Sequence, residues 1–97
     1  MNYKVVIEPR AILDIQDAVD YYDSKKEGLG FEFYAILEVH FKILVTNPTF
    51  QIKYKDYHGL PIQKYPFILL YYIDENVKTV YVLSVFNTFL NPDKYPK

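Results

Sequence analysis

Residues 63–97 of this 97-residue chain read QKYPFILLYYIDENVKTVYVLSVFNTFLNPDKYPK. Two apolar, tyrosine-rich runs, residues 66–73 and 77–86, flank the polar turn Asp74-Glu75-Asn76. Runs of β-branched and aromatic residues bounded by turn residues are typical of strands, so this stretch predicts a β-hairpin. The first run is almost wholly apolar, which indicates a strand in the middle of a sheet.

A strand and a helix are predicted at the start of the chain. Residues 3–7 are rich in β-branched side chains and predict a strand. Pro9 suits a first helical turn, where its missing N–H has no partner to lose. The helix should extend to about Lys25, because apolar residues then recur at helical spacing. These residues are Ile12, Ile15, Ala18 or Val19, and Tyr22.

A second helix should follow and pack against the first as an antiparallel hairpin. The glycines of Gly28-Leu29-Gly30 interrupt the first helical pattern. A new pattern begins at Phe33 or Tyr34, continues through Leu37, Phe41 and Leu44, and stops at Thr46-Asn47-Pro48.

The pattern changes to period two after Pro48, and residues 51–57 predict a further strand that Gly59-Leu60-Pro61 ends. The order β-α-α-β-β-β predicts an α+β domain in which the helical hairpin packs on a curved, mainly antiparallel four-stranded sheet. Residues 1–97 should form this single domain, with residues 91–97 as a mobile tail.

Composition excludes several classes of protein. The chain has no cysteine, so disulfides, thiolate metal sites and a cysteine nucleophile are excluded, and a reducing cytoplasm is the expected compartment. The first ten residues lack the long apolar run of a signal peptide or a membrane span. The net charge of −1 gives no strong field toward nucleic acid, although basic side chains gather in the second half.

The candidate chemical groups each have an ordinary structural explanation. His58 lies in a basic, aromatic stretch and could act as a general acid or base. His40, beside Phe41, is expected to lie at the edge of the core with its ring nitrogens in contact with water. The aspartates of the first helix could hold a cation, but an acidic, solvated face that suits the helix dipole is the better explanation. We expect no metal and no cofactor. The eleven tyrosines are better explained by half-buried strands than by base stacking.

Short phrases spread along nearly the whole chain resemble the RelE/ParE toxin superfamily of type II toxin-antitoxin systems, and within it the ParE-like, plasmid-stabilisation branch. The matching phrases are IEPRAIL at 7–13, DAVDYY at 17–22, GLG at 28–30 with Phe33, NP at 47–48, YKD at 54–56, YPF at 65–67, YYID at 71–74, VLSV at 82–85 and NPDK at 91–94.

This resemblance implies a bacterial, cytoplasmic toxin that a cognate antitoxin neutralises. RelE-like members cleave mRNA on the ribosome with basic side chains, whereas ParE-like members poison DNA gyrase. The resemblance places the nuclease's cations near Phe67 or Ile68 and near Asn87 or Thr88, and neither pair carries a positive charge. ParE-like sequences often carry His where Asn87 stands and Arg near His58, so the chain departs there too.

The remaining basic and polar groups could hold a phosphate backbone or an acidic protein patch, with no sequence-specific binding of nucleic acid. These target- or phosphate-binding candidates are Lys53, Lys55, His58, Lys64, Asn87, Lys94 and Tyr95, and the weak catalytic candidates are His58, Lys64 and Lys55. The favoured interpretation is a toxin that binds its target, DNA gyrase first. The alternatives are a ribosome-dependent mRNA endonuclease and a family member that has lost its toxicity.

Overall fold

The computed structural model describes residues 2–49, the backbone of 52–54, and residues 56–89. The elements follow in the order β1 (Lys4–Ile7), α1 (Pro9–Lys25), α2 (Leu29–Thr46), β2 (Ile52–Tyr54), β3 (Tyr57–Pro61), β4 (Phe67–Asp74) and β5 (Thr79–Asn87). The mobile tail predicted at residues 91–97 lies outside the described residues.

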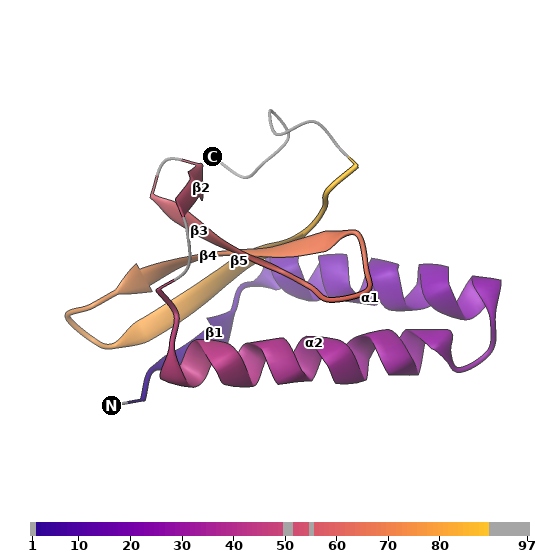
Figure 1. The fold of residues 1–97 in the computed structure, drawn as a ribbon, viewed down its shortest axis with the longest axis horizontal. Coiled ribbons are helices and arrows are strands. Elements are labelled where there is room, and N and C mark those ends of the chain that lie inside the picture. Colours follow the sequence, from indigo (N-terminus) through magenta and orange to yellow (C-terminus); the bar gives the residue numbers. More distant parts are fainter. Residues whose placement is uncertain (1, 50–51, 55, 90–97) are drawn as a thin grey trace.

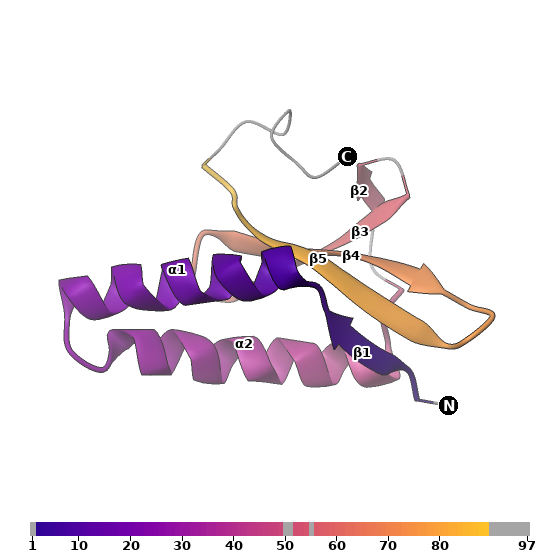
Figure 2. The same cartoon turned by 180° about the vertical axis from the view of Figure 1, so that it is seen from behind.

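The strands form one mixed sheet with the spatial order β1-β5-β4-β3-β2. β1 pairs with β5 in parallel, and the other pairs are antiparallel. β4 therefore lies in the centre, as its apolar sequence predicts. The helices α1 and α2 run antiparallel and cover one face of this sheet (Figures 1 and 2). The predicted α+β class and the helical hairpin are confirmed.

The segment predicted as one strand is divided into two. β2 and β3 pair with each other as short antiparallel strands, so the described sheet has five strands where four were expected. Gly59-Leu60-Pro61 was expected to end a strand but lies inside β3, and this expectation is wrong. Pro61 fits as the last residue of β3 because it pairs with Ile68 of β4 on one side, whereas the described part of β2 pairs only with Tyr57 and His58.

α1 has the predicted bounds, and Ile15 and Ala18 of the predicted stripe are buried, but the stripe begins at Ala11 and not at Ile12. Ala11 is buried, whereas Ile12 is 53% exposed.

α2 starts earlier than expected, at Leu29, because the connection from Lys25 of α1 is a short turn. Gly28 alone supplies the left-handed φ of 85°.

Gly30 is the point of closest approach between the two helices. A Cβ atom on Gly30 would lie 2.5 Å from the Val19 carbonyl oxygen and 2.8 Å from the Asp23 carboxylate carbon. Asp23 also accepts a hydrogen bond from the Gly30 N–H at 2.8 Å. A side chain of the first helix thus satisfies a free N–H in the first turn of the second.

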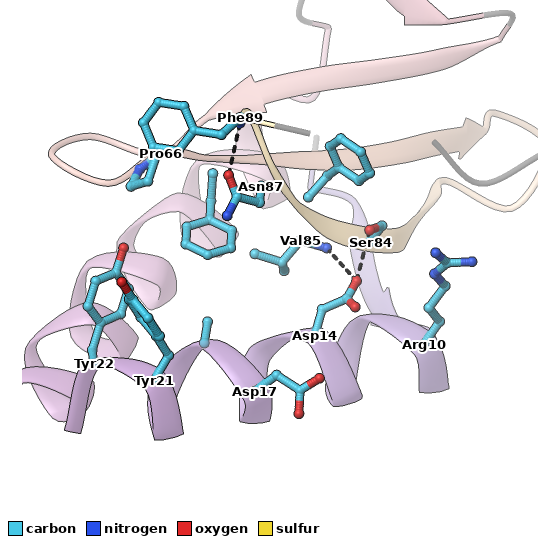
Figure 3. A pocket seen from close by; sticks show the side chains of 13 residues that line it. Arg10, Asp14, Asp17, Tyr21, Tyr22, Pro66, Ser84, Val85, Asn87 and Phe89 are labelled. Carbon is cyan, nitrogen blue, oxygen red and sulfur yellow. Dashed lines mark hydrogen bonds between the residues drawn. The ribbon is translucent and has the colours of Figure 1, made fainter. Parts of the chain in front are cut away.

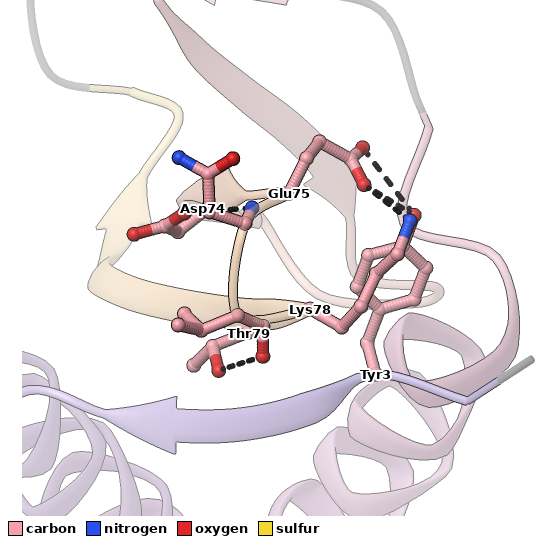
Figure 4. Close-up of polar contacts among 7 residues, drawn as sticks. Tyr3, Asp74, Glu75, Lys78 and Thr79 are labelled. Carbon is pink, nitrogen blue, oxygen red and sulfur yellow. Dashed lines mark hydrogen bonds and ion pairs between the residues drawn. The ribbon is translucent and has the colours of Figure 1, made fainter.

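Side chains of the turn between β4 and β5 contact Tyr3, the residue before β1, through hydrogen bonds that, together with an ion pair inside the turn, we call the Glu75 contact (Figure 4). The Tyr3 hydroxyl donates to Glu75 Oε1 at 3.0 Å, and the Lys78 ammonium lies 3.0 Å from the same oxygen. The Lys78 hydrogen bond, then that of Tyr3, lowers the pKa of the Glu75 carboxyl below its ordinary value. Glu75 in turn raises the pKa of Lys78.

The variant Gly30→Ala should lose about 1–3 kcal/mol of stability, because the added methyl group meets backbone that cannot move freely. Urea unfolding measures this loss. Gly28→Ala is the matched control: its Cβ meets no atom within 4 Å, and it should lose about 1 kcal/mol from the positive φ alone. A Gly30→Ala protein as stable as the wild type would contradict the close packing.

Glu75→Gln should alter stability only where Glu75 is ionised. A lowered folded-state pKa gives stability that is present above the unfolded value and lost as the pH falls through the folded value. The variant should therefore be less stable than the wild type at neutral pH and equal to it in strong acid. Thermal melts over this pH range measure the difference, with Glu27→Gln in the helix connection as control. A lower stability of Glu75→Gln that persists in strong acid would contradict the stabilising role of the Glu75 contact.

Candidate functional site

A β-bulge in β5 shapes the candidate site. Tyr71 pairs with Val82 but Leu70 pairs with Ser84, so β5 holds one extra residue at Leu83. The bulge changes which β5 side chains face the helices: Val80 and Val82 do so before it, and Val85 does so after it. Bulges bend a strand and redirect its side chains, and they are common beside functional sites.

Asp14 of α1 fixes this bulge to the helix. Its carboxylate oxygen Oδ2 accepts hydrogen bonds from the Ser84 hydroxyl at 2.8 Å and from the Val85 N–H at 3.1 Å (Figure 3). The Val85 N–H is thereby satisfied although the bulge disturbs the ladder. One carboxylate therefore positions both the end of β5 and the start of α1.

A groove of about 550 Å³ opens between α1 and the ends of β4 and β5 (Figure 3). Its apolar part includes Ala18, Val85 and Phe67, and its polar part includes Arg10 and Asn87. The thirteen lining residues are Arg10, Asp14, Asp17, Ala18, Tyr21, Tyr22, Pro66, Phe67, Ser84, Val85, Phe86, Asn87 and Phe89. Arg10 is the one positive side chain among them, against two carboxylates, so the groove does not suit a polyanion.

An aromatic cluster supports the inner end of the groove. Tyr22 packs on Phe33, with ring centroids 5.2 Å apart, and meets Tyr65 edge-on at 5.1 Å. Phe67 joins them 5.5 Å from Phe33. Burial, followed by the neighbouring Tyr65 and Tyr21, raises the pKa of Tyr22.

Phe89 stands at the outer end of the groove and is 84% exposed. Its backbone N–H donates to Asn87 Oδ1 at 2.9 Å, which fixes the turn directly after β5 (Figure 3). A large, exposed aromatic side chain beside an apolar groove is a feature of protein interaction sites.

Of the predicted site residues whose side chains the structure describes, Asn87 alone lines this groove. His58 lies on β3, where its ring stacks on Tyr71 at 5.5 Å. His58 pairs with Tyr71 of β4, and Asn87 pairs with Phe67, which lies four residues from Tyr71 on the same strand. His58 and Asn87 are therefore about 13 Å apart along the strand direction. Lys64 is exposed in the turn before β4, with a left-handed φ of 73°.

Four predicted residues cannot be placed. The side chain of Lys53 and the whole of Lys55, Lys94 and Tyr95 lie outside the described residues. The predicted basic surface is thus placed only at His58 and Lys64.

The second histidine is buried, contrary to the expectation that its ring nitrogens contact water. His40 Nδ1 lies 2.8 Å from the Ile36 carbonyl oxygen, and Nε2 lies 3.3 Å from the Gln63 N–H. Nδ1–H therefore donates while Nε2 accepts, which makes His40 a structural link between α2 and the turn before β4. The acidic face of α1 is also partly structural, through Asp14 and Asp23. No group of three or more metal-binding side chains occurs in the described ranges.

Sequence reasoning missed Arg10, Asp14, Tyr21 and Phe89 as site residues. The available signal was the serine in the middle of an apolar strand, since a buried Ser84 hydroxyl needs a partner. Nothing in the sequence indicated that Asp14 is this partner, because the two residues are far apart in the chain.

The arrangement of two helices on one face of a mixed sheet defines a small α+β domain. The fold is similar to that of a chain in a solved structure described as "Chromosomal ParDE TA system from P. aeruginosa". The TM-score is 0.76 at 14% sequence identity, over 88% of this chain and 95% of that chain. The resemblance is thus confirmed at the level of the fold.

No family model and no curated protein matches the chain. None of the described helices is long and apolar enough to cross a bilayer.

Asp14→Ala should lose about 1–3 kcal/mol of stability, because the Ser84 hydroxyl and the Val85 N–H lose their acceptor in a partly buried site. Urea unfolding measures the loss. Asp17→Ala is the matched control: it removes an exposed carboxylate from the same groove one turn along α1, and it should change stability by less than about 0.5 kcal/mol. Equal losses in both variants would refute the proposed anchor.

Proposed function

We propose that this protein is the toxin of a type II toxin-antitoxin system and acts by binding an essential target rather than by cutting RNA. A cognate antitoxin would neutralise it in the bacterial cytoplasm, and DNA gyrase is the first candidate target. The fold likeness to a chain of a ParDE toxin-antitoxin system supports the toxin part of this proposal. The candidate site supports the binding part.

The observation that carries the proposal is the chemistry at the ends of β4 and β5. Phe67 pairs with Asn87, and Ile68 pairs with Phe86, at the two places where the resemblance puts the cations of a nuclease. Phosphoryl transfer depends on positive groups aimed at the charge that develops in the transition state. An apolar and neutral pair of strand ends cannot supply them.

The groove supports docking instead. It combines an aromatic, apolar base with a rim of mixed charge, and its exposed Phe89 can anchor a partner. An apolar side chain or an amphipathic helix of an antitoxin or a target would fill such a groove. Aromatic anchors at the centre of an interface often contribute most of its binding energy.

A ribosome-dependent nuclease is the second candidate. Arg10 is the observation in its favour, since it brings one cation to the groove that Asn87 also lines. A third interpretation, a family member without toxicity, shares the same fold and predicts no effect on growth.

Induction of the chain alone should reduce colony counts, and Phe89→Asp should restore them. Phe89 is so exposed that the change should leave stability within about 0.5 kcal/mol of the wild type, so lost toxicity would report lost binding. Val77→Asp, which alters another exposed apolar side chain in the β4–β5 turn, is the matched control and should remain toxic. Full growth with the wild type would overturn the toxin proposal.

Two further measurements separate the targets. Purified gyrase should stop supercoiling DNA when the wild-type protein is added, and should continue with Phe89→Asp. Primer extension on translated mRNA should show an unchanged pattern after induction. New cleavage sites would favour the nuclease instead, and they should then disappear in Arg10→Ala.

A further inference from the structure

One face of the sheet is turned away from the helical hairpin (Figure 1), and a stacked pair of tyrosines, Tyr72 and Tyr81, belongs to this region. Val80 and Val82 belong to the core under the helices, so Tyr81 between them points to the opposite face. Tyr71 also enters the core, which turns its neighbour Tyr72 to the same opposite face.

These tyrosines are part of a row across the sheet. Tyr72 pairs with Tyr81. On the other side of β4, His58 pairs with Tyr71, so the antiparallel register sets Tyr57 beside Tyr72. Three neighbouring strands, β3, β4 and β5, therefore carry a tyrosine at one level, and we call Tyr57, Tyr72 and Tyr81 the tyrosine row.

The geometry of the row disfavours base stacking. The rings of Tyr72 and Tyr81 lie 4.9 Å apart with an interplanar angle of 20°, so each ring turns a face to the other. Single-stranded nucleic acid binds where aromatic faces are free to stack on bases. Rings that stack on one another offer a partner mainly their edges and hydroxyl groups.

Among the side chains that the structure describes, those charged beside the row are mainly negative. Asp74 follows Tyr72 by two residues on β4 and so shares its face, and the Glu8 N–H donates to the carbonyl oxygen of Val82, next to Tyr81, at 2.9 Å. Burial first, then Tyr81, Glu8, Asp74 and Tyr57, raises the pKa of Tyr72. Val5 and Ile7 of β1 pack toward the core. Side chains alternate along a strand, so Lys4 points to the opposite face, which is that of the tyrosine row. Two carboxylates against one ammonium group repel phosphate and attract a cation.

We propose that the tyrosine row, flanked by Glu8 and Asp74, is a docking surface for an arginine-bearing segment of a protein partner. A guanidinium group can pair with a carboxylate in two hydrogen bonds and donate others to tyrosine hydroxyl groups, and tyrosine is enriched in protein interfaces. The row lies on the sheet face opposite the groove, so its occupation does not require the proposed toxicity.

The test uses the full chain and a synthetic peptide of alternating arginine and serine. Titration of the isotope-labelled protein should shift the amide signals of Tyr57, Tyr72 and Tyr81. The same peptide with glutamate in place of arginine, and an oligothymidylate of equal length, should leave these signals unchanged. Shifts caused by the oligothymidylate would show a nucleic-acid surface and overturn the proposal, as would arginine-peptide shifts confined to the helices.

Variants separate a specific surface from general attraction. The double variant Glu8→Gln/Asp74→Asn should weaken binding of the arginine peptide about fivefold or more, as the loss of two partly exposed charge pairs predicts. Glu27→Gln/Glu38→Gln removes two exposed carboxylates from the helical hairpin and should leave binding unchanged. Tyr72→Phe keeps the ring and removes the hydroxyl, so it should weaken binding without unfolding the sheet. Equal weakening by the two double variants would overturn the proposal.

Discussion

The hydrogen bonds of Asp14 are the constraint on which the candidate site depends. Val85 pairs with Leu69 directly after the bulge in β5, and its N–H donates to Asp14; without this acceptor the N–H would cost about 1–3 kcal/mol. Asp14 supplies the acceptor from α1 and holds Ser84 with the same oxygen. This contact joins the first helix to the last strand, and the groove between them exists because the two are held together at this point.

The groove and the strand ends together favour a protein that binds. The inner end of the groove is aromatic and apolar, its rim has mixed charge, and Phe89 stands exposed at its outer end. A catalytic site for RNA cleavage would need cations where Phe67 and Asn87 face each other. The opposite face of the sheet differs in character, since its stacked tyrosines and flanking carboxylates suit a basic partner. The domain thus offers two surfaces of different chemistry on its two sides.

The sequence allowed most of the fold to be predicted, because local pattern determined it: Pro9 and Lys25 are the observed ends of α1, and β4 is the central strand. The errors came where tertiary contacts override local preference. Gly59 and Pro61 form a strand because β4 pairs with them, and His40 is buried because Ile36 and Gln63 satisfy its ring nitrogens. The site was the least predictable part. Asn87 was identified from a family resemblance, but the role of Asp14 depends on a contact between residues 70 positions apart.

The central claim is that Asp14 fixes the bulge and thereby forms the groove. Hydrogen exchange of the Val85 amide tests this most directly, because that N–H donates to Asp14. Buried, bonded amides exchange only when the structure opens, whereas unbonded ones exchange freely. The account predicts that Val85 exchanges as slowly as the core residues Val80 and Val82 in the wild type, and much faster than they do in Asp14→Ala. Fast exchange of Val85 in the wild type, or unchanged slow exchange in the variant, would contradict the account.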